Sequence, residues 1–428
     1  MIYSGLSIEF IYMQGKKHVV LAGLNFHPAK STGDKNFWVD LIPEAATGLD
    51  RITIISIRNE QEKTQRMQIH NCQVCVHYLF PQFLEQSDGF FHRTGTFPFL
   101  RWIVVKFVII KQIIKMLADI YAEAPFHQIH LMDNFGFTNR RIARWAARLG
   151  IRVAVSAMAY MGKLPLLLYH AYLLISYNSR RLTVVPYSRL YSSKLLQLGI
   201  KKQNICYIPW GVWPADNGND AAAVSSRPSF LSSDPGNRAS VLPSFQLPAN
   251  TRVFLWAGFI QQIGENDFFQ ALDMAGKALK QDLKAVFVFA FKPEACRSHY
   301  RRYHRPEQGI YIIATSPDEF RYWQKRADVF YSPLWNRRAI ITPPLTWLEM
   351  LNLGKPILTL LVPGAEDVIT QGVNGFAARD EKELLACMFM LAEKERGMAV
   401  QCRQKIAADY NISRIAGQYL ALWIGRRE

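Results

Sequence analysis

The segment "AGFIQQIGENDFFQAL" (Ala257–Leu272) joins an apolar run to a stretch with helical composition. The apolar run, Val253 to Ala257, has the length of a buried strand and ends at Gly258. A strand, a glycine turn and a helix start in this order can present backbone N–H groups to a phosphate. The loop contains no Lys or Arg, which leaves open whether it handles a phosphate or is simply a turn.

The same alternation continues through the rest of the second half. Strand-sized apolar runs follow in the order "KAVFVFAF", "GIYIIA", "DVFYSP" and "KPILTL". Helices are predicted over 266–279, 317–326, 345–353 and 380–394. Strands separated by helices indicate a parallel sheet with both faces covered.

The first half of the chain shows a similar pattern. Residues 18–24 ("HVVLAGL") predict a buried strand, followed by a glycine-bearing loop, a helix over 37–47 and the strand "RITIISI". The runs "IHLM" and "VAVSAM" flank a helix at about 137–149. Residues 214–250 are rich in Ser, Pro, Asn, Ala and Gly without periodicity, which predicts a long mobile loop.

These patterns predict an α/β protein of two doubly wound, Rossmann-like domains facing a central cleft. The predicted parts are an N-terminal Rossmann-like domain, an interdomain loop, a C-terminal Rossmann-like domain and a C-terminal helix that packs back on the first domain, over 1–210, 211–250, 251–400 and 401–428. A cleft of this kind surrounds one ligand with the carboxyl ends of both sheets. The pattern fits a glycosyltransferase, an epimerase-like enzyme or a periplasmic binding protein.

Composition supports two sizeable cores and an anionic partner. Half of the 428 residues are apolar, and a chain of this length is expected to divide into two domains. Lys and Arg number 51 against 34 Asp and Glu, for a net charge of +17. Such a surplus favours phospholipid surfaces, nucleic acid or phosphorylated substrates, although a generally basic, soluble surface would also explain it.

The sequence favours a cytoplasmic protein with reduced thiols. Cys72 and Cys75 form a C-x-x-C without a second pair at zinc spacing, so we interpret them as strand residues and expect no metal site. A secretory signal is not recognisable, which disfavours the periplasmic alternative. The segment "LPLLLYHAYLLISYN" is shorter than the ~18–20 residues of a membrane span and contains His170.

One helix-length segment, Phe99–Leu117, combines strong apolarity with spaced basic residues. Long basic side chains on such a helix can reach lipid phosphates while apolar residues enter the interface. This interpretation predicts a peripheral contact with the inner face of an anionic membrane. The alternative is a core-packed helix with a few exposed lysines.

Three segments of the second half occur in an order typical of one enzyme family. They are "YSSKLLQLGIKKQNICYIPWGVW", "RADVFYSPLWNRRAIITPPLTWLEMLNLGKPILT" and "PGAEDVITQGVNGFAARDEKELLACM". Over roughly residues 180–400 they resemble the GT-B nucleotide-sugar glycosyltransferases of family 4. The resemblance implies the GT-B fold, a nucleotide sugar as donor substrate, no other cofactor and transfer with retention of configuration.

The resemblance also implies a set of site residues. The ribose carboxylate of the family falls on Glu349, and the helix opening at Leu345 and Thr346 would aim its N–H groups at the diphosphate. The complete nucleotide-sugar set is Gly258, Gln261, Pro344, Leu345, Thr346, Glu349, Gly364 and Glu366. The candidates on the acceptor side are Lys30, Gly33 and Asp133.

This chain departs from the family pattern where the family places its charges. Ile341 stands at the position of a sugar-contacting Glu, while Phe259 and Ile263 replace an Arg and a Lys aimed at the diphosphate. The chain also contains no D-x-D, so we expect the protein itself to supply the positive charge, without a metal. The catalytic candidates are therefore Arg337 and Arg338 in the loop before the donor helix, with Lys35 approaching from the first domain.

Three functions remain open at this point. The first is an active glycosyltransferase acting on a lipid-linked or cell-envelope glycan, with its cations supplied from these positions. The second is a catalytically degenerate relative that serves as a scaffold or partner subunit. The third is a nucleic-acid-binding protein, which we do not expect because no recognisable RNA-binding motif interleaves aromatic with basic residues.

Overall fold

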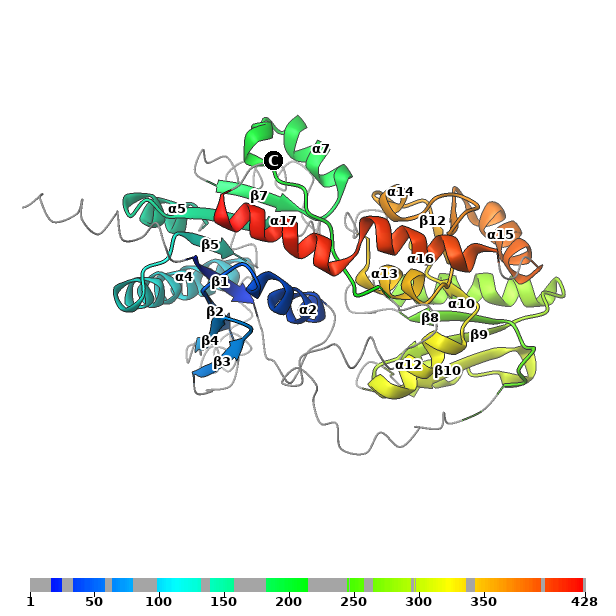
Figure 1. The fold of residues 1–428 in the computed structure, drawn as a ribbon. Coiled ribbons are helices and arrows are strands. Elements are labelled where there is room, and N and C mark those ends of the chain that lie inside the picture. The colour runs from blue at the N-terminus through cyan, green and yellow to red at the C-terminus, as the bar shows by residue number, and fades with distance from the viewer. Residues whose placement is uncertain are drawn as a thin grey trace, which may run out of the picture. The chain divides into compact units, whose positions relative to one another are not determined.

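The computed structural model describes most of the chain, with gaps. The described residues are 17–24, 34–57, 64–79, 98–131, 139–157, 182–214, 245, 247–257, 265–293, 296, 298–335, 343–393 and 397–425. They fall into two compact units, each built on its own sheet (Figure 1). The first unit takes its residues from Met1–Met158, Lys163–Trp210 and Ile412–Glu428, and the second from Ala159–Gly162 and Gly211–Asn411.

The first unit contains a seven-stranded sheet in the order β3-β4-β2-β1-β5-β6-β7. Its strands are β1 (His18–Leu24), β2 (Arg51–Ile57), β3 (Gln65–Ile69), β4 (Cys72–Leu79), β5 (Gln128–Leu131), β6 (Arg152–Ala157) and β7 (Leu182–Pro186). The edge strand β3 is antiparallel to β4, and the other neighbouring strands are parallel. The sequence prediction did not include β3.

Helices cover both faces of this sheet. They are α2 (Asp34–Ala46), α4 (Pro98–Glu123), α5 (Asn139–Arg148) and α17 (Ile412–Ile424), with α7 (Arg189–Gln197) and the short η2 (Lys202–Asn204) after β7. Figure 1 shows α4 and α5 on one side of the strands and α2 with α17 on the other. Parallel strands require such crossover connections, which explains why the strands are buried on both faces.

The second unit contains a six-stranded, all-parallel sheet in the order β10-β9-β8-β11-β12-β13. Its strands are β8 (Val253–Ala257), β9 (Val286–Phe291), β10 (Ile310–Ala314), β11 (Val329–Tyr331), β12 (Ile357–Leu360) and β13 (Gly375–Ala378). Its helices are α10 (Glu265–Lys280), α11 (Ser298–Arg301), η5 (Pro306–Gln308), α12 (Pro317–Arg326), α13 (Leu345–Asn352), α14 (Ala365–Val368), α15 (Glu381–Glu393) and α16 (Met398–Asp409).

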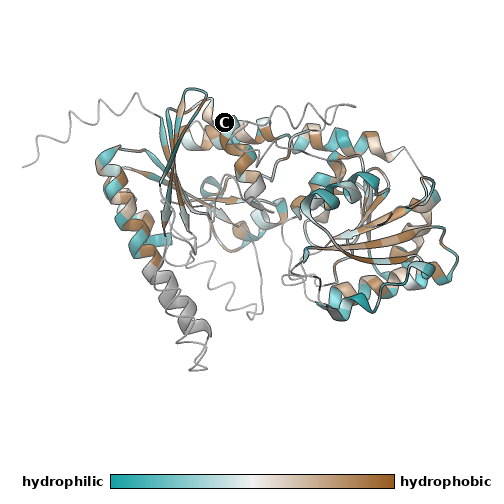
Figure 2. Ribbon diagram, turned by 90° about the horizontal axis from the view of Figure 1, so that it is seen from below, coloured by the Kyte–Doolittle hydropathy of each residue, from teal (hydrophilic) through white to brown (hydrophobic). Residues whose placement is uncertain are grey.

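Aromatic side chains fill the core of the second unit. Trp256 packs against Phe289 with ring centroids 5.7 Å apart, and Phe268 meets Phe289 edge-on at 5.6 Å. All three rings are buried. The strands of this sheet are coloured mostly as hydrophobic in Figure 2, as expected for a sheet covered on both faces.

The chain ends in two helices where the sequence suggested one helix over 401–428. The helix α16 stops at Asp409, and α17 begins at Ile412. Between them Val212 pairs with Asn411 and donates its N–H to the Tyr410 carbonyl at 2.8 Å. This bridge interrupts the helical hydrogen bonds, so α16 belongs to the second unit and α17 to the first.

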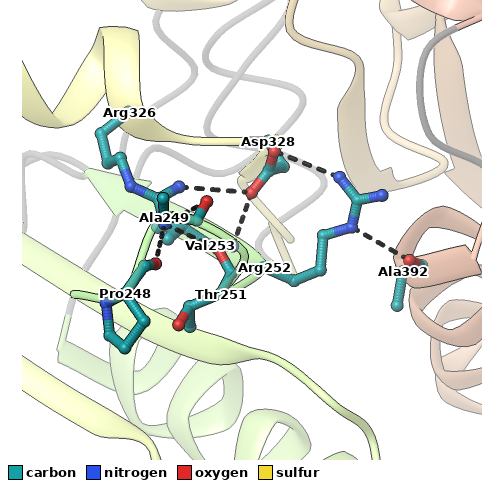
Figure 3. Close-up of polar contacts among 8 residues, drawn as sticks. All are labelled: Pro248, Ala249, Thr251, Arg252, Val253, Arg326, Asp328 and Ala392. Carbon is teal, nitrogen blue, oxygen red and sulfur yellow. Dashed lines mark hydrogen bonds and ion pairs between the residues drawn. The ribbon is translucent and has the colours of Figure 1, made fainter.

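The predicted long loop 211–250 is attached to the second unit at its described carboxyl end. Arg326 donates from Nη2 to the carbonyls of Pro248, Ala249 and Thr251, at 2.9, 3.4 and 2.8 Å (Figure 3). Upstream of this attachment, Phe245 stacks on Tyr311 at 4.6 Å. Residues 215–244 and 246 lie outside the described part of the chain, so the predicted mobility of the loop stays a prediction.

The carboxylate of Asp328, just before β11, organises the same region of the second unit. Asp328 accepts the Val253 N–H at 2.9 Å and Arg252 Nη1 at 3.2 Å, and Arg326 Nη1 lies 3.7 Å away (Figure 3). Arg252 in turn donates from Nε to the Ala392 carbonyl at the end of α15. The cluster therefore fixes the amino ends of β8 and β11, the central strands of the sheet.

Candidate functional site

The strand order of each sheet identifies where a ligand would bind. In the second unit the chain moves from β8 outward through β9 and β10, and then from β11 outward through β12 and β13. The strand order reverses between β8 and β11, so their carboxyl ends flank the crevice that doubly wound sheets use for ligands. In the first unit the equivalent point lies between β1 and β5.

The predicted donor-site residues follow the strands at this switch point. Gly258 and Gln261 come after β8, and Arg337 and Arg338 come after β11; all four lie outside the described residues. The other donor-site candidates begin the helices α13 and α14, which follow β11 and β12. The described candidates on α13 and at the start of α14 therefore follow strands of this sheet, and the roles of all the donor-site candidates stay predictions.

The helix α13 begins without a side-chain cap. Pro344 occupies the N-cap position in an extended conformation, with φ −59° and ψ 139°. Proline offers no side-chain acceptor, so the first-turn amides of Leu345 and Thr346 receive no capping bond from it. Trp347 fixes the helix to the end of β11, because its indole N–H donates to Ser332 Oγ at 3.1 Å. The helix therefore presents a positively polarised start at the switch point.

Glu349 lies on the half-exposed side of the same helix. Its Oε2 accepts Gln324 Nε2 from α12 at 3.5 Å, the long limit of a hydrogen bond. The neighbouring Leu348 and Met350 are buried and hold the helix against the sheet. A carboxylate in this position can accept hydroxyl hydrogen bonds.

The loop after β12 contains a glycine for a conformational reason. Gly364 is buried and has φ +86°, a left-handed conformation that side chains disfavour, and it caps α14. Tyr410 donates its hydroxyl to the Asp367 carbonyl at 2.6 Å and thereby anchors α14. Glu366 is exposed on the first turn of α14.

The start of α10 differs from a phosphate-binding helix start. Asp267 is buried there and accepts the Trp335 N–H at 2.9 Å, while Glu265 accepts the Tyr300 hydroxyl at 2.8 Å. Two carboxylates in the first turn offset the positive end of the helix dipole and repel a phosphate. The sequence displays these two acids in the motif "GEND", beside the loop that lacks the cations of the family.

The acceptor-side candidates belong to the switch point of the first unit. Lys30 and Gly33 follow β1 and Asp133 follows β5, and all three lie outside the described residues. Lys35 lies in the first turn of α2, and only its backbone is described. The structure therefore leaves the roles of these four residues as predictions.

A buried polar network lies beside the carboxyl end of β5. The Trp423 indole N–H donates to His130 Nδ1 at 2.9 Å, so the neutral imidazole carries its proton on Nε2. His130 Nε2 then donates to Ser156 Oγ at 2.9 Å, and the Tyr187 hydroxyl donates to the same oxygen at 2.6 Å. Burial lowers the pKa of His130 to about 3. This histidine and serine are enclosed in the core, so they hold structure and do not act as a nucleophilic pair.

The same network attaches the last helix of the chain to the first unit. The Trp423 carbonyl accepts His127 Nε2 at 3.1 Å and Arg152 Nη2 at 2.5 Å. On α2, Trp38 lies edge-on to His130, with ring centroids 5.6 Å apart. The carbonyl of Trp423 on α17 therefore contacts the amino ends of β5 and β6, while its indole reaches His130 in the core.

The described residues contain no group of three or more His, Cys, Asp or Glu side chains that could hold a metal ion. Cys72 and Cys75 are buried as free thiols in β4, and burial raises the pKa of Cys72 to about 12. The interpretation of this pair as strand residues is therefore confirmed. Over the described part of the chain, no helix is both long and apolar enough to cross a membrane.

No protein-family model and no curated protein sequence matches this chain. Solved structures match it along nearly its whole length. Sucrose-phosphate synthase from Thermosynechococcus elongatus has a TM-score of 0.63 at 12% identity, covering 96% of this chain and 99% of that protein. HepE from Anabaena, in complex with UDP-glucose, has a TM-score of 0.59 at 12% identity, and the match covers 96% of this chain and 100% of HepE. An Escherichia coli structure described as trehalose-6-phosphate bound with UDP-2-fluoro glucose has a TM-score of 0.59 at 10% identity and covers 95% and 99%.

These structural relatives are GT-B glycosyltransferases. At identities of 10–12% the likeness establishes the fold, and this chain has the GT-B fold. The α/β class and the two doubly wound sheets predicted from the sequence are confirmed.

Proposed function

We propose that this protein is a glycosyltransferase that moves a sugar from a nucleotide-sugar donor to an acceptor hydroxyl. The observation that carries the proposal is the uncapped start of α13 at the switch point of a GT-B second unit. The solved relative HepE holds UDP-glucose, which makes UDP-glucose the first donor to test here.

In this proposal the second unit binds the nucleotide. The N–H groups at the start of α13 face the diphosphate, and Glu349 accepts hydrogen bonds from the ribose hydroxyls. Because Asp267 and Glu265 offset the dipole of α10, the diphosphate is held on the α13 side of the crevice. Gly364 and Glu366 complete that side.

The positive charge for the leaving group comes from arginine and lysine. Arg337 and Arg338 precede α13 in the sequence, and Lys35 lies in the first turn of α2. As the bond between the anomeric carbon and the diphosphate breaks, negative charge grows on the phosphate, where guanidinium groups stabilise it. The acceptor hydroxyl attacks the same face of the sugar and gives its proton to the departing phosphate, so the configuration is retained. The step is metal-independent, and chelation by EDTA should leave the rate unchanged.

The acceptor in this proposal is a glycan or a lipid-linked sugar presented at the cytoplasmic face of a membrane. Lys30, Gly33 and Asp133 are the acceptor-side candidates. The basic composition of the chain supports an anionic surface as a partner, and the segment Phe99–Leu117 contributes to it.

Calorimetry with UDP-glucose and UDP tests the donor assignment. Glu349→Ala should weaken UDP binding by roughly 10- to 100-fold, because one hydrogen bond to a charged group contributes about 1.5–3 kcal/mol. Glu307→Ala, at an exposed position of η5, removes the same charge and serves as the control. Equal affinities for the wild type and Glu349→Ala would contradict the ribose role.

A second function is a donor-binding protein that no longer transfers sugar. The carboxylates at the start of α10 and the missing family cations favour this alternative. Turnover of radiolabelled UDP-glucose by water distinguishes the two, because an active donor site slowly hydrolyses its donor when no acceptor is present. Intact UDP binding with no hydrolysis above the rate of an Arg337→Ala/Arg338→Ala variant would support the inactive alternative.

A further inference from the structure

The outer side of α5 is a row of arginines. Arg141, Arg144 and Arg148 are exposed along the helix, one or two turns apart. The opposite side buries Ile142 and Ala146 against the unit. The helix contains no acidic residue, so its outer side carries positive charge alone.

The described part of α4 presents lysines in the same way. Ile110, Ile113 and Leu117 are buried, while Lys111 and Lys115 are exposed one turn apart on the opposite side. Figure 2 shows hydrophilic and hydrophobic residues alternating along this part of the helix. The core-packed alternative is therefore confirmed for residues 109–117, and the lysines project from a packed helix.

The two helices form one basic face. They contact each other and lie on the same side of the sheet (Figure 1). We define the basic face as Lys111, Lys115, Arg141, Arg144 and Arg148. Within the described chain, Lys111, Lys115, Arg144 and Arg148 form no ion pair.

Few carboxylates oppose this charge. Those of the described part of α4 are Asp119 and Glu123, and α5 adds none. Glu123 lies 3.5 Å from Arg51 and 3.9 Å from Arg66, so other cations already offset it. The basic face therefore keeps a local excess of positive charge, which attracts an anionic surface within about 10 Å at 0.1 M salt.

We propose that the basic face of α4 and α5 docks the first unit onto an anionic phospholipid surface. The side chains extend from two adjacent helices, so several can meet a flat layer of headgroup phosphates at once. Arginine and lysine on the outer side of packed helices bind such a layer without inserting apolar residues. This inference takes its purpose from the proposed lipid-linked acceptor, but the binding itself can be measured without any transfer reaction.

A lipid surface fits the basic face better than a nucleic acid does. Proteins that bind single strands stack bases on exposed aromatic side chains. On the described parts of α4 and α5, the aromatic residues Tyr121 and Trp145 are half-buried, and none is exposed. Nucleic-acid binding is therefore an outcome of the test and not part of the proposal.

Co-sedimentation of the full chain with vesicles tests the proposal. The anionic vesicles contain phosphatidylglycerol in phosphatidylcholine, and neutral vesicles contain phosphatidylcholine alone. The variant Lys115→Gln/Arg144→Gln/Arg148→Gln removes three charges of the basic face, all at exposed positions. The matched control, Arg301→Gln/Arg305→Gln/Lys382→Gln, removes three exposed charges from the second unit. Melting temperatures verify that both variants are folded.

We expect the wild type to bind anionic vesicles, to dissociate from them as the salt concentration rises and not to bind neutral vesicles. Each basic residue near an anionic surface contributes roughly fivefold, so the face variant should partition roughly 100-fold more weakly. The partitioning of the control variant onto anionic vesicles should fall far less. Equal losses in the two variants, equal binding to neutral vesicles or no binding by the wild type would overturn the proposal.

Two further measurements separate this inference from its alternatives. A labelled single-stranded RNA that binds more tightly than vesicles at 0.15 M salt, and is released by the face variant, would overturn the lipid assignment. Calorimetry with UDP-glucose on the same samples tests the proposed function independently. Retained vesicle binding with no nucleotide binding would refute the glycosyltransferase and leave the basic face in place.

Discussion

Acid should destabilise the first unit through two buried histidines. His130 is fully buried, and desolvation lowers its pKa to about 3. His18 on β1 is 3% exposed, and its pKa is lowered to about 4, chiefly by burial. Its imidazole ring forms hydrogen bonds with Thr53 Oγ1 and with the Pro125 carbonyl. Both rings are therefore neutral in the folded protein near pH 5.

The sign and size of the effect follow from proton linkage. Between the folded values near 3 and 4 and the unfolded value of 6.5, the unfolded chain binds more protons than the folded one. The free energy of unfolding therefore falls as the pH falls below 6.5. At pH 5 each histidine lowers it by about 2 kcal/mol relative to neutral pH, or about 4 kcal/mol together. A loss of this size is a large part of the stability of an ordinary domain.

Urea unfolding at pH 7 and at pH 5 measures the change in the free energy of unfolding. Hydrogen exchange of peptides from β1 and β5 identifies which transition belongs to the first unit. The variants His18→Gln and His130→Gln should each reduce the difference between the two pH values by about 2 kcal/mol, whatever their own stability. His70→Asn, at an exposed turn position with φ 52°, is the control and should leave the difference unchanged. A pH dependence that persists undiminished in both histidine variants would refute the reasoning.

Two more predictions concern the second unit. Asp328→Ala leaves Arg252 and Arg326, 16% and 18% exposed, without their carboxylate, and should cost about 2–3 kcal/mol in the free energy of unfolding by urea. A loss below 0.5 kcal/mol would show that the cluster of Figure 3 contributes little. Deleting residues 217–243, which spares the stacked ring of Phe245, should leave the melting temperature nearly unchanged, whereas Phe245→Ala should lower it by several degrees. The reverse ranking in differential scanning fluorimetry would mean that the deleted segment is packed against the protein.

The sequence by itself determined the architecture, because hydrophobic periodicity is a local property. The helix predicted over 317–326 coincides with α12, and that over 266–279 lies within one residue of α10 at each end. Strands buried on both faces must be uniformly apolar, and "KAVFVFAF" satisfies this requirement without any knowledge of its neighbours. The order of strand and helix then leaves few topologies, since parallel crossovers are right-handed.

The sequence also selected where the candidate site lies, but not its electrostatics. Glu349 and the start of α13 are candidates because a family motif places them after a strand, and the carboxyl ends of parallel strands meet at one edge. The sequence displays the carboxylates of α10, but not that Asp267 is buried and accepts the N–H of Trp335, 68 residues away. A hydrogen bond across that separation leaves no periodic signal in the sequence.

Only the tertiary structure determined the contacts between residues that lie far apart in the sequence. The break between α16 and α17 depends on the pairing of Val212 with Asn411, two residues that lie far apart in the sequence. The tautomer of His130 depends on Trp423, which lies 293 residues away along the chain and donates to it in the core, and burial in that core lowers the pKa of His130. Local propensity records what a residue prefers beside its sequence neighbours. Burial and hydrogen bonding are set by whichever distant residues the fold brings into contact, so these properties appear only when the chain is folded.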